Sequence, residues 1–211
     1  MIDIVQLNPA QLSRGAIERA AAAIRAGDIV AIPTDTVYGL AGNPFDAGAV
    51  QRIVRLKGRS GGKPILLLVD SLRQVEMLAA ELPESYRRLA DRFWPGPLTM
   101  ILRAASSVPP WITAGAGTVA VRLPASIAVR ELARAARVPL TGTSANRSGQ
   151  PAALTARQVL EHFSVELALI LDAGPAPSRA PSTLVDLTGE PRIVREGAIA
   201  AADVLSLFRP E

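Results

Sequence analysis

Short apolar segments alternate with amphipathic helical segments along the whole chain, and this alternation constrains the fold more than any other feature. The segments with strand character are 29–32, 65–69, 98–103, 118–123, 139–143, 168–172, 183–187 and 191–195. Strands and helices intermingle without a strict strand–helix–strand repeat. The pattern therefore predicts an α/β fold around a twisted, mixed β-sheet. We expect residues 1–211 to form a single domain, because the length suits one ordinary core.

Helix boundaries are marked by local signals. Residues 14–26 place apolar side chains at helical spacing and are followed by Gly27, while Asp46 is positioned to cap a helix that runs through Leu56. Further helices are expected at 84–93, 126–136 and 202–208, the first of them ended by the break at 94–97. Capping boxes are expected at Ser71 with Gln74 and, more weakly, at Thr155 with Gln158.

The residue inventory excludes several classes of site. The chain has no cysteine and a single histidine, His162. Disulfides and thiolate chemistry are therefore excluded, and neither a zinc site nor a Ser-His-Asp triad is supported. The chain contains no apolar run near the ~20 residues that cross a membrane. The first residues also lack the pattern of a secretion signal, so we expect a cytoplasmic protein.

Two glycine-rich segments resemble nucleotide-binding motifs but do not match them residue by residue. A P-loop needs glycine five residues before its Gly-Lys pair, but Lys57 occupies that position ahead of Gly62-Lys63, and Pro64 follows. Residues 115–117 lack the third glycine of the dinucleotide fingerprint and precede a strand instead of a helix. Any nucleotide must therefore be bound in another way.

Lysine is confined to one short segment. The formal net charge of +4 favours anionic partners only weakly. However, of 23 basic residues only Lys57 and Lys63 are lysines, and both lie in 57–64. Lysine is a compact point charge and arginine a planar fork, so the two differ wherever geometry matters. The alternative is that two lysines persist by chance in a surface loop.

Polar groups collect where apolar strands end. They lie in segments 33–40, 118–124, 141–149, 181–186 and 193–198. Within 118–124, Arg122 interrupts an apolar strand and needs a partner if it points inward. A substrate carboxylate would give a bidentate pair. The alternative is an internal ion pair.

In this order along the chain, the segments PTDTVYGLAGNPFD, KGR with GKPILLLV, WPGPLTMIL, TVAVRLP, TSANRSG, PSTLVD and IVREGAI resemble the YrdC-like threonylcarbamoyl-AMP synthase family. The resemblance covers about residues 12–200. Its more discriminating part pairs Lys57 and Arg59 (KxR) with Ser144 and Asn146 (SxN). The resemblance implies a YrdC-like fold in its short form, without the extra C-terminal domain of longer members.

The resemblance also implies a reaction. Threonine, bicarbonate and ATP would give threonylcarbamoyl-AMP and pyrophosphate, for N6-threonylcarbamoyladenosine modification of tRNA by a separate transferase. ATP is a substrate, and Mg²⁺ is expected to be held mainly by the nucleotide, with no protein metal ligands. The alternatives are a non-catalytic double-stranded-RNA or tRNA-binding protein, and a paralogue that activates another carbamate.

Site residues follow from the matched motifs. The resemblance implies that Lys57 and Arg59 are catalytic. The ATP-binding residues would be Lys57, Arg59, Lys63, Thr118, Asn146 and Arg195. Threonine would be held by Thr36, Arg122, Ser144 and Ser182. Ser60 and Leu68 depart from residues common in the family. Residues 173–181, rich in proline, are expected either to cover the site or to connect two strands passively.

Overall fold

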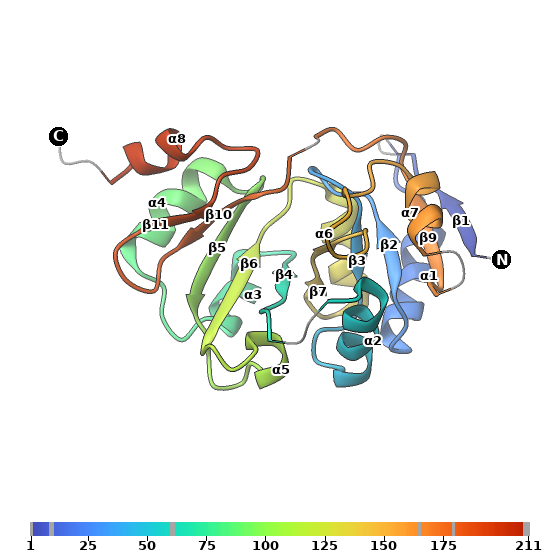
Figure 1. Ribbon diagram of the computed structural model, residues 1–211, viewed down its shortest axis with the longest axis horizontal. Coiled ribbons are helices and arrows are strands. Elements are labelled where there is room, and N and C mark those ends of the chain that lie inside the picture. The colour runs from blue at the N-terminus through green and yellow to red at the C-terminus, as the bar shows by residue number, and fades with distance from the viewer. Residues whose placement is uncertain (1, 9–10, 60–61, 164–165, 179, 209–211) are drawn as a thin grey trace.

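The computed structural model describes residues 2–8, 11–59, 62–163, 166–178 and 180–208. The α/β class with mixed strands is confirmed, but the strands form two sheets where one was expected. Figure 1 shows the two sheets side by side, each accompanied by helices. Within the described residues no helix is both long and apolar enough to cross a membrane.

The first sheet has five strands in the order β1-β9-β2-β3-β8. Their bounds are β1 Asp3–Gln6, β2 Val30–Ile32, β3 Gly39–Ala41, β8 Thr143–Ser144 and β9 Leu169–Asp172. β1 and β2 both pair with β9 in parallel, whereas β3 is antiparallel to β2 and to β8. Neither β1 nor β3 was predicted as a strand.

Helices cover both faces of this sheet. They are α1 Arg14–Arg25, α2 Ala47–Lys57, α6 Ile127–Ala136 and α7 Ala156–His162. Side chains of α1 and α6 form one core cluster with the sheet, and side chains of α2 and α7 form another. The expected cap of α2 is confirmed, since Asp46 accepts hydrogen bonds from the Gly48 and Ala49 amides.

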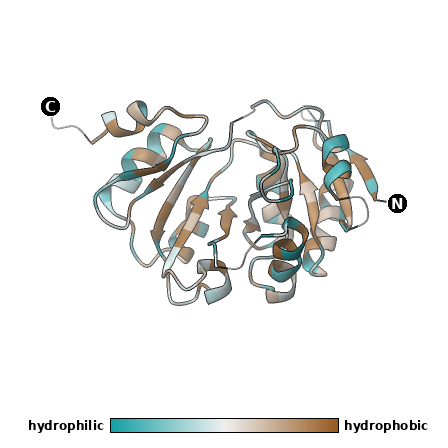
Figure 2. Ribbon diagram, in the orientation of Figure 1, coloured by the Kyte–Doolittle hydropathy of each residue, from teal (hydrophilic) through white to brown (hydrophobic). Residues whose placement is uncertain are grey.

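The second sheet has six strands in the order β11-β10-β5-β6-β4-β7. Their bounds are β4 Leu66–Leu68, β5 Leu98–Arg103, β6 Thr118–Arg122, β7 Leu140–Thr141, β10 Thr183–Asp186 and β11 Arg192–Arg195. The helices beside it are α3 Leu72–Leu78, α4 Glu84–Phe93, α5 Pro110–Thr113 and α8 Ala201–Ser206. Figure 2 shows that the strands of both sheets are largely hydrophobic and that polar residues gather on the helices.

Core and non-core side chains alternate along the strands of the second sheet, so one of its two faces is available for a site. Leu98, Met100 and Leu102 of β5 lie in the core cluster shared with α3, α4, α5 and α8. Successive strand side chains point to opposite faces, so the residues between them, such as Thr99, face away from those helices. This second face of the sheet is turned toward the five-stranded sheet.

The chain passes from one sheet to the other at residues 140–144. β7 belongs to the six-stranded sheet and β8 to the five-stranded sheet, with only Gly142 between them. The predicted strand at 139–143 is therefore two short strands. A side chain at Gly142 would meet Leu68, because an added Cβ would lie 2.7 Å from its Cγ. The tight crossing fixes the position of the polar residues that follow it.

Both expected capping boxes differ in detail. Ser71 precedes α3, but its side chain makes no capping hydrogen bond to that helix. Thr155 does cap α7, by accepting a hydrogen bond from the Gln158 amide. In each case the glutamine, Gln74 or Gln158, accepts from the amide one residue before the cap residue. The starts of both helices were thus predicted correctly. The hydrogen bond to each glutamine side chain, however, comes from the residue before the predicted cap and not from the cap residue itself.

Candidate functional site

A cavity of about 460 Å³ lies between the two sheets. Its floor is the uncovered face of the six-stranded sheet, which contributes alternate strand residues from β5, β6 and β10. The opposite wall comes from residues 36–37, after β2, and from residues 142–144. Eight of the ten residues expected at the site line this cavity: Thr36, Arg59, Lys63, Thr118, Arg122, Ser144, Ser182 and Arg195.

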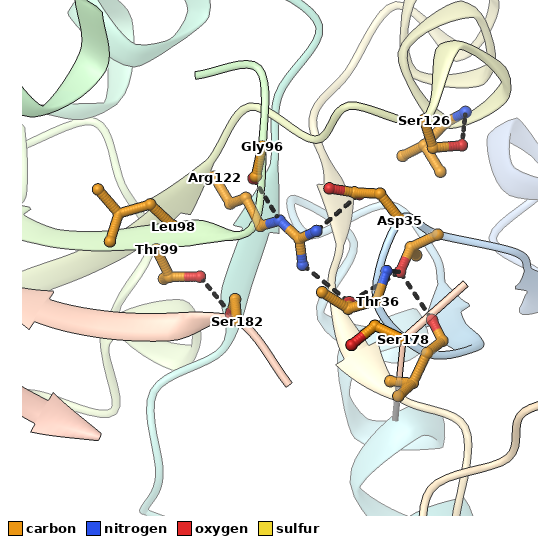
Figure 3. Close-up of polar contacts among 12 residues, drawn as sticks. Asp35, Thr36, Gly96, Leu98, Thr99, Arg122, Ser126, Ser178 and Ser182 are labelled. Atoms are coloured by element: carbon orange, nitrogen blue, oxygen red, sulfur yellow. Dashed lines mark hydrogen bonds and ion pairs between the residues drawn. The ribbon is translucent and has the colours of Figure 1, made fainter. Parts of the chain in front are cut away.

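Arg122 is buried at the centre of a polar network (Figure 3). Its Nε donates to the Gly96 carbonyl at 3.0 Å, its Nη1 donates to Thr36 Oγ1 at 3.0 Å, and its Nη2 lies 2.6 Å from Asp35 Oδ1. The internal ion pair named as the alternative for this residue is therefore present. Hydrogen bonds thus use two of the five guanidinium N–H groups, and Nη2 is buried beside Asp35 with no hydrogen-bond partner among the described residues. Arg122 also lines the cavity.

Asp35 depends on Arg122 for compensation of its charge. Both carboxylate oxygens are buried, and neither accepts a hydrogen bond from the described residues. An isolated buried carboxylate is strongly disfavoured, so the contact with Arg122 is what stabilises it. Asp35 does not line the main cavity and was not predicted as a site residue.

Thr99 is a further cavity residue that was missed by motif comparison. Its hydroxyl lies 2.7 Å from that of Ser182, and both residues are buried. The pair puts two hydroxyl groups on the floor of the cavity, close to Arg122 in Figure 3. A hydroxyl residue near the start of the apolar strand 98–103 was the available signal.

All charged side chains among the residues that line the cavity are cations. They are Arg59, Lys63, Arg122 and Arg195. Arg59 Nη2 donates to the Pro64 carbonyl at 3.1 Å, and Arg195 Nη2 donates to the Ser182 carbonyl at 2.8 Å. Desolvation lowers the pKa of both arginines, of which Arg59 is half-buried and Arg195 more exposed. Such a cavity favours an anionic ligand.

Lys57 and Asn146 are the two expected site residues that do not line the cavity. Both are buried. The Lys57 ammonium donates to the backbone and side-chain oxygens of residues 144–146. Asn146 Oδ1 accepts from Ser144 Oγ and from Lys57, and its Nδ2 donates to two backbone carbonyls. In this structure the KxR and SxN elements therefore bind each other on one side and expose Arg59 and Ser144 on the other.

The proline-rich segment 173–181, expected either to cover the site or to connect two strands, lies mainly at a second cavity. Residues 173–177 line a second cavity of about 440 Å³, together with Asp35 and residues 125–128. Among the described residues of 173–181, Pro181 alone lines the main cavity, next to Ser182. Arg179 lies outside the described residues. Whether the segment closes over ligands stays a prediction.

The donor set bears on how a metal ion would be held. Within the described residues no group of three histidine, cysteine, aspartate or glutamate side chains is arranged to bind a metal. The cavity instead offers hydroxyl groups and cations. A magnesium ion in this cavity would have to take most of its ligands from a bound phosphate compound and from water.

Sequence comparison places the chain among known proteins. A family profile described as "Telomere recombination" (Sua5/YciO/YrdC) matches residues 22–197. A relative from Pyrococcus abyssi, named threonylcarbamoyl-AMP synthase, is 42% identical over 89% of this chain and 56% of its own length. A relative of the same name from Thiobacillus denitrificans is 38% identical over 86% of this chain and 96% of its own length.

Solved structures support the same relationship. The crystal structure of P. abyssi Sua5 complexed with L-threonine superposes with a TM-score of 0.92 at 39% identity, over 98% of this chain and 60% of that one. E. coli YciO has a TM-score of 0.87 at 24% identity and shows the shared fold. The chain spans just over half the length of the P. abyssi relative and nearly all of the T. denitrificans relative. The sequence match and these identities show that the chain belongs to the Sua5/YciO/YrdC family.

Proposed function

We propose that this protein is a threonylcarbamoyl-AMP synthase, which joins threonine, bicarbonate and ATP into threonylcarbamoyl-AMP and releases pyrophosphate. The observation that carries the proposal is the cavity between the sheets, whose charged lining residues are all cations and whose floor presents buried hydroxyl groups. A triphosphate and an amino-acid carboxylate are both anionic, so the cavity is complementary to the two substrates. The names of the relatives supply the reaction.

Threonine is assigned to the inner part of the cavity. Arg122 lines the cavity and makes two hydrogen bonds within the described protein, so we assign its remaining N–H groups to the substrate carboxylate. Thr36, Ser144 and Ser182 place hydroxyl groups around the same space. The threonine bound to the related P. abyssi protein supports an amino-acid site in this fold.

ATP is assigned to the more open part, where Arg59, Lys63, Thr118 and Arg195 line the cavity. The two arginines and Lys63 offset the negative charge of the phosphates, and Mg²⁺ bound to those phosphates would add to this. Arg59 is half-buried, so its interaction with phosphate would be screened less by solvent than that of the exposed Arg195.

The reaction needs positioning more than proton transfer by the protein. Threonine's amine and bicarbonate form a carbamate with loss of water. A carbamate oxygen then attacks the α-phosphorus of ATP, and the bond from that phosphorus to the bridging oxygen breaks to release pyrophosphate. Charge crowds the phosphates throughout, so preorganised cations are the contribution that the lining residues of this cavity supply.

The product would pass to a separate transferase that modifies tRNA, in the cytoplasm. The transferase is implied by the family resemblance, and the location is the expectation from the sequence pattern. An alternative role in binding double-stranded RNA or tRNA would not require the cavity to be filled. An experiment can therefore distinguish the catalytic role from the RNA-binding role.

The test is pyrophosphate release measured with each substrate omitted in turn. We expect release only when threonine, bicarbonate and ATP are all present, with threonylcarbamoyl-AMP identified by mass spectrometry. Arg59→Met should remove most of the release. The matched control Arg157→Met, at an exposed arginine on α7, should leave it unchanged. RNA binding without pyrophosphate release would instead identify a non-catalytic binding protein.

A further inference from the structure

We propose that Lys57 is a positioning residue: its ammonium holds residues 144–146 in place, so that Ser144 faces the cavity, and it makes no contact with the nucleotide. The inference rests on the proposed function for the identity of the ligands. The contacts that support the inference are present in the free protein. In these contacts Lys57 faces residues 144–146, whereas it was expected from the sequence to bind the nucleotide.

The ammonium is fully engaged by one short segment. Lys57 Nζ donates to the Ser144 carbonyl at 2.5 Å, to the Asn146 carbonyl at 2.9 Å and to Asn146 Oδ1 at 3.3 Å. An ammonium has three N–H donors, so these contacts leave none for a phosphate oxygen. The residue is only 6% exposed and does not line the cavity.

The local backbone explains why Lys57 reaches this position. It is the last residue of α2, and Gly58 ends the helix in the left-handed conformation with φ 56°. The Lys57 carbonyl accepts a hydrogen bond from the Ser148 amide at 2.7 Å. Lys57 therefore contacts the loop from two sides, through its main chain and through its ammonium.

Without the ammonium the loop would be unstable in this form. Two carbonyls and one amide oxygen converge on Nζ, and acceptors removed from water are costly when they lack a donor. Ser144 Oγ also donates to Asn146 Oδ1 at 2.5 Å, so the orientation of the Ser144 side chain depends on an oxygen that Lys57 holds. The cation thus acts on the cavity through Ser144.

Arg59 provides the matched contrast. It lies two residues from Lys57 and lines the cavity, with its Nη2 bound to the Pro64 carbonyl outside the 144–146 loop. If Lys57 is a positioning residue and Arg59 a ligand contact, removal of each cation has a different effect on the free protein. Lys57→Met and Arg59→Met both remove the charge and keep an unbranched stem.

Hydrogen exchange in the free protein separates the two roles. The Ala145 amide donates to the Tyr38 carbonyl, and the Ser148 amide donates to Lys57, so both report on the loop. We expect about tenfold faster exchange at these amides in Lys57→Met, corresponding to about 1.4 kcal/mol, and no change in Arg59→Met. Unchanged loop exchange in Lys57→Met would overturn the proposal.

A second measurement uses the unaltered protein and does not depend on how a variant folds. Lys57 and Lys63 are the only lysines, so ¹⁵N labelling of lysine side chains gives two ammonium signals to assign. We expect the Lys57 ammonium protons to be protected from water before any ligand is added, and ATP to shift the Lys63 signal more. A Lys57 signal that is unprotected in the free protein and shifts most with ATP would show a phosphate contact.

Action through Ser144 is tested by a double-mutant cycle on the threonine KM. Ser144→Ala and Lys57→Met should each raise this KM, and the double variant should resemble Ser144→Ala alone. Additive effects would show that Lys57 supports the fold without positioning Ser144. The exchange and NMR measurements use no threonine, so they stand even if the enzyme proves to act on another substrate.

Discussion

Replacement of Asp35 by asparagine tests how the buried ion pair and the proposed threonine site are coupled. In the free protein Arg122 is 3% exposed, and the Asp35 carboxylate compensates its charge at 2.6 Å. Asparagine keeps the shape of the side chain and removes the charge. Threonine would then become the main carboxylate partner of Arg122.

The stability loss can be bounded from the contacts. Breaking a buried ion pair by removing one partner costs about 3–5 kcal/mol. We expect about 3 kcal/mol here, because Arg122 keeps its hydrogen bonds to the Gly96 carbonyl and to Thr36. For a chain of this size about 2–4 °C of melting temperature corresponds to each kcal/mol, so the free Asp35→Asn protein should melt about 6–12 °C lower.

Threonine should offset part of this loss. If the uncompensated charge of Arg122 tightens threonine binding about tenfold, saturating threonine adds about 1.4 kcal/mol more to the free energy of unfolding of the variant than to that of the parent. The assay is thermal unfolding with and without threonine. Threoninol, which lacks the carboxylate, serves as the control ligand. Glu84→Gln removes an exposed partner of Arg88 and should change the melting temperature by little.

Two results would contradict this reasoning. A variant as stable as the parent would mean that Asp35 does not compensate Arg122. An equal threonine shift in both proteins, or an equal shift with threoninol, would mean that the substrate carboxylate binds elsewhere. The first result tests the ion pair within the fold, and the second tests the proposed threonine site. Failure of one can therefore be distinguished from failure of the other.

Three further predictions concern single side chains. Arg122→Lys should raise the KM for threonine about 10–100-fold and the KM for ATP less, because lysine cannot reproduce a bidentate contact; equal rises in steady-state kinetics would refute this. Arg59→Ala should lower the rate of pyrophosphate release about 10²–10³-fold, and a fully active variant would remove Arg59 from the phosphate site. Burial, and secondarily Arg59, lowers the pKa of Lys57 from 10.5 to about 8, so between these pH values the unfolded chain binds more protons than the folded protein. Lys57 should therefore make the free energy of unfolding increase with pH between about pH 8 and 10.5. Urea titrations at several pH values should show that Lys57→Met removes this increase; the same pH dependence in the variant would contradict the lowered pKa of Lys57.

The parts of the fold that were predicted from the sequence are those set by local chemistry. The helix at 84–93 was predicted with its observed bounds, and the cap at Asp46 was confirmed. The division into two sheets was not predicted, since strand pairing is not a local property. β1, for example, pairs with β9 far along the chain, and β8 is only two residues long. No periodicity of side chains marks such short or distant pairs.

The cavity floor could have been predicted more fully from side-chain alternation. Within 98–103, a floor residue at Thr99 alternates with core residues such as Met100, and Arg122 alternates with Val121 in the next strand. Applying the same period to both strands places Thr99 and Arg122 on one face. Motif comparison drew attention to Arg122 and not to Thr99, although the hydroxyl in an apolar strand was visible in the sequence.

Lys57 and Arg122 show why the type of a side chain does not determine its partner. A buried cation must be compensated, and both carbonyl oxygens and carboxylates of the protein can do this as well as a ligand can. Lys57 donates hydrogen bonds to residues 144–146, and Arg122 contacts Asp35, Thr36 and the Gly96 carbonyl. Arg122 lines the cavity, whereas Lys57 does not. The contacts that each cation makes within the protein, which only the three-dimensional structure gives, are therefore the basis for proposing a ligand contact for Arg122 and a positioning role for Lys57.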